Sequence, residues 1–154
     1  MPFAAAVWYH HQWPKNGFGG FSHGVRAEEE RRHVTTYRLV MPEDMNHYGF
    51  LFGGKMLMWI DEVAWIAVSN DYPGFRFVTV GMSEVTFKKS VHPRAVLRFD
   101  AQKKRVGTTS VTYHVDVYRR DIEAENEEHV FHTDITFVRV DKAGAKIPLS
   151  AAKE

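Results

Sequence analysis

One acidic residue stands among apolar side chains in the longest helical pattern of the chain, residues 53–70, and is the first candidate for chemistry. This residue is Asp61, and its helical neighbours three and four positions away are Leu57, Met58, Ala64 and Trp65. An ionised carboxylate among such groups is costly without partners, so its presence points to a functional role. The alternative is a carboxylate that reaches solvent or contacts another chain at a dimer interface, and we expect the same of Glu62.

Two glycines, Gly53 and Gly54, open this helical pattern. The first amides of a helix lack intrahelical partners, so a substrate carbonyl can bind there when no Cβ blocks its approach. That arrangement is an oxyanion hole, although the two glycines could equally do no more than shape the turn into the helix. Asp61 lies about 12 Å further along the axis at ~1.5 Å per residue, so one substrate reaches both only by lying along the helix. Asn46, in the preceding loop, could position a water or the carbonyl, or serve only as a turn residue.

The nine histidines include two that are three residues apart, His129 and His132. In a regular strand this spacing places the side chains on opposite faces, so we expect no chelation by the pair. His114 and Asp116 share one strand face, as do His132 and Asp134, and these pairs could form a site across two strands. Cross-strand polar pairing on a solvated sheet face is the simpler interpretation, so no metal site is predicted. The absence of cysteine excludes disulfides, thiolate metal sites and a cysteine nucleophile.

The chain of 154 residues carries 20 basic and 19 acidic side chains, and this balance argues against a nucleic-acid binder. Basic residues gather at predicted strand ends, among them Lys104 and Arg105, where they could bind an anionic ligand group or simply remain solvated. No stretch approaches the ~20 apolar residues needed to span a bilayer, and the N-terminus lacks the basic residues of a secretory signal. We therefore expect a cytoplasmic protein without membrane insertion, which the absence of cysteine also fits.

The elements that would position these residues are one helix and five strands. Alternating or β-branched apolar runs predict strands over residues 34–41, 77–87, 95–104, 110–119 and 129–140. The order β-α-β-β-β-β predicts an α+β fold in which an antiparallel sheet wraps around a single long central helix. Residues 31–145 would form this domain, after an irregular extension of residues 1–30 and before a tail of residues 146–154. The sheet edges and the far side of the helix remain open, so dimerisation is expected.

Three stretches of the chain resemble a known family. They are residues 46–61 (NHYGFLFGGKMLMWID), residues 78–91 with VTV and VTFKKSV, and residues 104–111 (KRVGTTSV). The pattern is similar to that of the hotdog-fold acyl-CoA thioesterases, in particular the bacterial broad-range and the brain acyl-CoA hydrolases. The resemblance implies hydrolysis of a fatty acyl-CoA to free fatty acid and CoA by a homo-oligomer, a dimer or trimer of dimers, with active sites at the dimer interface. It implies no cofactor, because coenzyme A is part of the substrate.

The same resemblance implies a role for each site residue. Asp61 would act as general base or as nucleophile, and a second catalytic residue, Asn46, would come from the other subunit. The amides of Gly53 and Gly54 would form the oxyanion hole. Contacts to CoA would be made by Lys104, Arg105, Thr108, Thr109 and Ser110.

The chain departs from the family pattern at two places. Tyr48 stands where relatives often carry a second Asn, and residues 92–94 (HPR) replace the Gly-Asp turn usually found there. Two other functions stay open, a non-catalytic acyl-CoA binding or sensing protein and a hotdog dehydratase or hydratase. Enzymes of the latter kind use a catalytic His, and the nearest candidate, His47, lies in the loop and not at the expected place.

Overall fold

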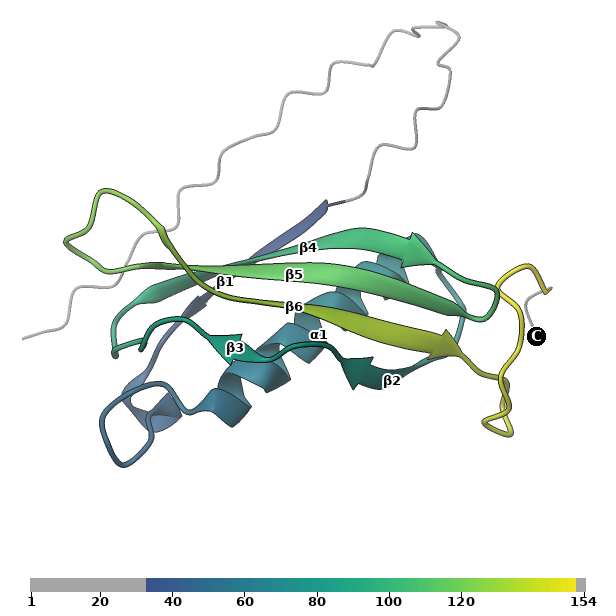
Figure 1. Cartoon of the computed structure of the whole chain (residues 1–154), viewed down its shortest axis with the longest axis horizontal. Coiled ribbons are helices and arrows are strands. Elements are labelled where there is room, and N and C mark those ends of the chain that lie inside the picture. Colours follow the sequence, from purple (N-terminus) through teal and green to yellow (C-terminus); the bar gives the residue numbers. More distant parts are fainter. Residues whose placement is uncertain (1–32, 152–154) are drawn as a thin grey trace, which may run out of the picture.

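One long helix lies against one face of a single antiparallel sheet (Figure 1). The computed structural model describes residues 33–151, so the extension predicted over residues 1–30 lies outside the described part. The helix is α1 (Gly53–Asp71), and a short 3-10 helix, η1 (Pro42–Asp44), precedes it. The strands are β1 (His33–Leu39), β2 (Phe77–Met82), β3 (Thr86–Phe87), β4 (Val96–Val106), β5 (Ser110–Arg120) and β6 (Glu128–Arg139).

The core lies between the helix and the inner face of the sheet. In β5 the buried apolar residues are every second one, Val111, Tyr113, Val115 and Val117, and of the polar residues between them only Thr112 is buried. From α1 the core receives Ile60, Val63, Ala64 and Val68, and the ring of Trp59 meets Phe99 of β4 edge-on, with the ring centroids 6.4 Å apart. The predicted α+β fold and the predicted helix are therefore confirmed, the helix ending one residue later than expected.

The sheet has two open edges in the single chain. Its strand order is β1-β4-β5-β6-β2, with β3 also pairing with β6, so β1 and β2 form the borders. The far side of α1 is open as well, because Met58 and Trp65 are each 51% exposed. On the border strand β2, Val78 and Val80 are also exposed, by 44% and 54%. An apolar surface of this kind next to a free strand edge is typical of a protein–protein interface.

The strand predicted over residues 77–87 is divided into β2 and β3. Both pieces pair with β6, but Met82 lies opposite Ile135 and Thr86 opposite His132, so this side carries one extra residue. The chain bulges outward at this point, and Glu84 takes a φ of 20°. The carbonyl of Ser83 accepts a hydrogen bond from the Thr133 hydroxyl, which anchors the bulge to β6. An alternating apolar pattern continues across such an interruption, which is why the sequence alone did not reveal it.

A second bulge lies in β6 and corrects a prediction. Phe131 pairs with Val117 and His129 pairs with Tyr118, which leaves Val130 as an extra residue. Val130 and Phe131 are both buried, although they are consecutive. The alternation of side chains is therefore shifted by one residue, and His129 and His132 lie on the same outer face of the sheet. Their assignment to opposite faces was wrong because it assumed a regular strand.

The chain after β6 folds back onto the β4–β5 turn. The buried guanidinium of Arg139 donates to the carbonyls of Pro148 and Ala151, at 2.7 Å each, and its plane lies over the ring of Phe75. The amide of Leu149 donates to the carbonyl of Thr108 at 2.8 Å. Residues 147–151 are thus held by the domain, while the boundary at residue 145 stays a prediction. No helix in the described part of the chain is long and apolar enough to cross a bilayer.

Candidate active site

Asp61 lies on the side of α1 that faces the border strand β2. Its carboxylate is half-buried, and the hydroxyl of Thr79 donates to its Oδ1 at 2.7 Å. Within residues 33–151, Thr79 is the only residue that hydrogen-bonds to this side chain. The second oxygen, Oδ2, therefore stays available to a water molecule or a substrate atom, as a general base or a nucleophile requires.

The surroundings of Asp61 differ from the expected apolar enclosure. In the single chain its helical neighbours Met58 and Trp65 point outward and are half exposed, so they do not cover the carboxylate. The neighbouring acid, Glu62, is exposed and forms an ion pair with Arg38, which matches its predicted solvated character. Asp61 is thus set apart from Glu62 by its position at the border of the exposed apolar surface.

Thr79 is the residue of this site that sequence reasoning did not single out. It belongs to one of the three stretches that carry the family resemblance, yet a threonine in a strand has no chemical mark of its own. Its role depends on β2 packing beside α1, which brings together two residues 18 positions apart. The available signal was the polar residue between two valines on a strand predicted to follow the helix.

The helix starts with two free amide groups. Residue Phe52 caps α1 without a side-chain hydrogen bond, and its carbonyl accepts from the amides of Lys55 and Met56. Within the described residues the amides of Gly53 and Gly54 donate no hydrogen bond. A Cβ on Gly54 would lie 2.7 Å from the Phe52 ring, so the glycine also has a packing role. The unpaired amides at the positive end of the helix dipole can bind a developing oxyanion.

Asn46 shapes the loop before the helix and shares a cavity with Gly53. Its Oδ1 accepts from the amides of Tyr48 and Phe50, at 2.9 and 3.2 Å, so only its NH₂ group is left for a ligand. Asn46, Phe50, Gly53 and Phe87 belong to the lining of a cavity of about 340 Å³, with Lys88 and Lys89 at its wall. Asp61 is not part of this lining. Within one chain the structure brings Asn46 and Gly53 together and places Asp61 elsewhere on the helix.

The five residues predicted to contact CoA fall into two places. Lys104 and Arg105 lie on the outer face of the sheet, at an open depression of about 460 Å³ that Asp134 also lines. Burial acts to raise the pKa of Asp134, but hydrogen bonds from Lys104 and His114 outweigh it and hold that pKa below its usual value. The carboxylate thus stays ionised and keeps the Lys104 ammonium in an ion pair.

The other three predicted CoA contacts, Thr108, Thr109 and Ser110, follow in the β4–β5 turn. The carbonyls of Thr108 and Thr109 accept from Leu149 and Arg139, so the backbone of this turn is already used to hold the C-terminal residues. They do not line the depression that contains Lys104 and Arg105. The structure does not gather these five residues into one site within a single chain.

Both departures from the family pattern lie in the loops around the Asn46 cavity. Tyr48 is 74% exposed, and its ring contacts His47 with the centroids 3.9 Å apart. His92 meets Phe50 edge-on, and Arg94 adopts a φ of 71°, a left-handed conformation that favours glycine. The backbone turn expected there is therefore formed without a glycine. His47, the candidate of the hydratase alternative, is exposed on the loop.

One helix held against a curved antiparallel sheet, with a carboxylate on the helix and free amides at its start, defines a hotdog thioesterase fold. The chain belongs to the Thioesterase superfamily, which matches residues 48–125. It is 30% identical over 125 residues to the uncharacterized acyl-CoA thioester hydrolase YkhA of Bacillus subtilis, covering 81% of this chain and 72% of that protein.

Solved structures agree with this assignment. An acyl-CoA hydrolase from Staphylococcus aureus in complex with butyryl coenzyme A superposes with a TM-score of 0.69 and 28% identity, covering 75% of this chain and 70% of that one. A hexameric acyl-CoA thioesterase without ligand superposes with a TM-score of 0.71 and 31% identity, covering 77% and 76%.

Proposed function

We propose that this protein is an acyl-CoA thioesterase that hydrolyses a fatty acyl-CoA to the free fatty acid and CoA. The observation that carries the proposal is the Asp61 carboxylate on a thioesterase-superfamily helix, held by Thr79 through one oxygen and open at the other. The Staphylococcus aureus enzyme, which binds butyryl coenzyme A, supports this substrate class. Structures of that enzyme include alanine variants of an asparagine, an aspartate and a threonine, which stand in the same chain order as Asn46, Asp61 and Thr79.

In the proposed reaction Asp61 removes a proton from a water molecule, whose oxygen attacks the thioester carbonyl carbon. The negative charge that develops on the carbonyl oxygen is bound by the amides of Gly53 and Gly54. The carbon–sulfur bond then breaks, and the CoA thiolate takes the proton that Asp61 received. Direct attack by the carboxylate, with hydrolysis of the resulting anhydride by water, uses the same groups and remains the second route.

The complete site is proposed to form between two copies of the chain. Asp61 lies beside the free edge of β2 and the exposed apolar side chains of α1, whereas Asn46 and Gly53 line a separate cavity of the same chain. Pairing of two β2 edges would cover the apolar surface and let a second copy supply the asparagine and the glycine amides. A thioesterase of Yersinia pestis with 28% identity and a TM-score of 0.70 is hexameric, which supports assembly beyond a dimer.

The first experiment measures CoA release from acyl-CoAs of several chain lengths with a thiol reagent. Because the chain contains no cysteine, the reagent reports only the released CoA. Asp61→Asn is expected to lower kcat by about 10²- to 10⁴-fold, the contribution of a general base. The matched control is Glu62→Gln, the neighbouring exposed carboxylate, which should retain activity. No turnover by the parent chain, combined with a rise in melting temperature on adding acyl-CoA, would replace the proposal by a binding or sensing protein.

The shared site is tested by mixing two inactive variants, Asp61→Asn and Asn46→Ala. If each site takes one residue from each subunit, a random dimer mixture contains about a quarter of its sites intact, so about a quarter of the parent activity returns. Native mass spectrometry verifies that mixed oligomers have formed. Mixed oligomers that stay inactive would show that both residues act within one subunit.

A further inference from the structure

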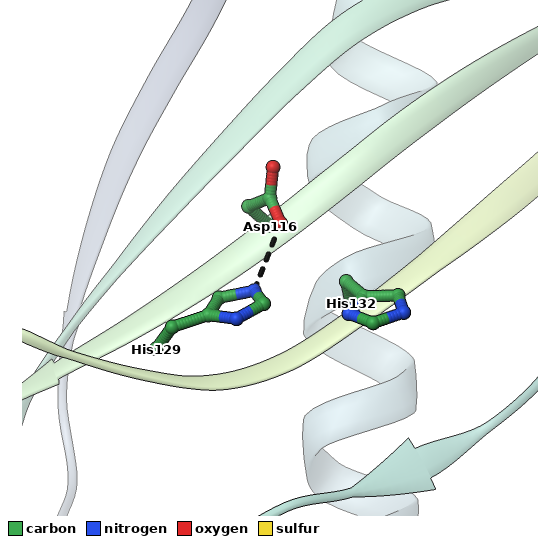
Figure 2. A group of neighbouring side chains, drawn as sticks. All are labelled: Asp116, His129 and His132. Atoms are coloured by element: carbon green, nitrogen blue, oxygen red, sulfur yellow. Dashed lines mark hydrogen bonds and ion pairs between the residues drawn. The ribbon is translucent and has the colours of Figure 1, made fainter.

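Three side chains with metal-binding chemistry meet on the outer face of the sheet, opposite α1 (Figure 2). Asp116 comes from β5, and His129 and His132 come from β6. All three are half-buried, and one nitrogen or oxygen atom from each lies within 4.8 Å of the others. No part of the proposed hydrolysis uses these residues.

The bulge at Val130 creates this group. In a regular strand His129 and His132 would lie on opposite faces, but the extra residue turns both imidazoles to the outer face. Their rings lie nearly parallel, with an interplanar angle of 6° and centroids 5.5 Å apart. Asp116 is the residue opposite His132 in the strand pairing, so the two side chains project from the same face of the sheet.

Close polar contacts connect the group to a neighbouring imidazole, His114. His129 Nε2 lies 2.8 Å from Asp116 Oδ1, and the other carboxylate oxygen lies 3.4 Å from Nε2 of His114. His114 is itself held by Asp134, whose Oδ1 lies 2.6 Å from its Nδ1. The carboxylate of Asp134 thus fixes the ring of His114, which in turn contacts the proposed ligand Asp116.

We propose that Asp116, His129 and His132 bind one divalent first-row transition ion, with zinc as the reference. Two imidazoles and one carboxylate, without a thiolate, form a ligand set that suits such ions and not calcium or magnesium. Two ligands each about 2.1 Å from a zinc ion lie roughly 3.4 Å apart at a tetrahedral angle. Half-buried side chains within 4.8 Å of one another need only small rotations to reach that spacing. The ion would join β5 to β6.

One neighbouring cation opposes binding. The ammonium of Lys88 lies 3.1 Å from Nδ1 of His129, so it must move when an ion binds at Nε2. Lys88 is exposed and its long side chain can turn into solvent. The site is therefore expected to bind the ion at one per chain but less tightly than a site without this lysine.

The test uses the full-length chain without an affinity tag, treated with a chelator and titrated with ZnCl₂ by calorimetry and with Co²⁺ by visible absorption. His132→Gln and Asp116→Asn are each expected to weaken binding by at least about ten-fold. His33→Gln is the matched control, because His33 also lies 3.4 Å from an aspartate, Asp100, but has no third ligand within the described residues. This control should bind like the parent chain.

A second measurement covers the case in which a variant fails to fold. Imidazole NMR signals of the unaltered chain are recorded with and without Zn²⁺, and the signals of His129 and His132 should shift while that of His33 does not. The proposal is overturned if no ion binds, if His132→Gln and Asp116→Asn bind as tightly as His33→Gln, or if the shifts occur at other histidines.

Discussion

The hydroxyl of Thr79 can be removed without disturbing the strand that carries it, and this change tests the proposed site most sharply. Thr79→Val keeps a β-branched side chain of the same shape on β2, so the strand and its pairing with β6 should persist. It removes the hydrogen bond to Asp61 Oδ1, leaving the carboxylate free to rotate away from the water it must deprotonate.

The size of the effect follows from the kind of bond that is lost. A hydrogen bond to a charged group contributes about 1.5–3 kcal/mol, and the partial exposure of Asp61 places this one at the lower end. Because ~1.4 kcal/mol corresponds to a factor of ten, kcat should fall about ten-fold. Thr79 holds the carboxylate and not the acyl chain, so KM should change by less than about two-fold.

The assay is steady-state CoA release, with two further variants as controls. Thr79→Ser keeps the hydroxyl and should restore most of kcat. Thr35→Val removes a bond of the same type, from the Thr35 hydroxyl to Asp100 at 2.8 Å, on the far strand β1, and should leave kcat unchanged. A Thr79→Val enzyme with parental kcat, or a Thr79→Ser enzyme as slow as Thr79→Val, would refute the positioning role.

Three further changes test the assembly and the fold. Val80→Lys places a charge at the free edge of β2 and should shift the oligomer toward monomer in light scattering, with loss of hydrolysis. The control Ile122→Lys changes another exposed apolar residue, in the β5–β6 loop, and should do neither. Tyr113→Phe removes the phenol that donates to the buried carboxylate of Asp71 at 2.5 Å and should lower the free energy of unfolding in urea by about 1–3 kcal/mol. Burial, and after it the hydrogen bond to Asp71, raise the pKa of Tyr113 in the folded protein. The contribution of Tyr113 to folding stability is therefore complete below its unfolded pKa of about 10 and is lost as the pH rises further. The Tyr113→Phe variant should lack this alkaline loss of stability. Arg139→Met removes the guanidinium that holds the C-terminal carbonyls and should speed limited proteolysis after β6, whereas unchanged cleavage would contradict that anchoring role.

Features that depend on neighbours along the chain were predictable. The helix over residues 53–70 and the alternation of Val111, Val115 and Val117 are periodic patterns, and each was recovered with nearly the observed bounds. The open helix face was predictable for the same reason. The helix carries apolar side chains on two opposite faces, and the face with Met58 and Trp65 cannot pack into the core that buries the other face. The division of the strand predicted over residues 77–87 was not, because a bulge leaves the local pattern almost unchanged.

In the candidate site, too, residues recognisable from their neighbours along the chain were predictable, and contacts between distant segments were not. Asp61 was identified from residue type and helical position, and Gly53 and Asn46 from the loop that enters the helix. The pairing of Asp61 with Thr79 could not be found in this way, since it depends on where β2 lies relative to α1.

By itself the sequence determined which residues face inward. Apolar side chains that recur at the period of a helix or a strand lie on one face of it, and burying that face is favourable whatever element packs against it. The tertiary structure alone decided which polar groups meet. The packing of β2 beside α1 brought Thr79 to Asp61, and one extra residue at Val130 brought His129 to the face of His132. The first contact depends on how a strand packs beside a distant helix. The second depends on strand pairing, in which a shift of one residue reverses every side chain that follows.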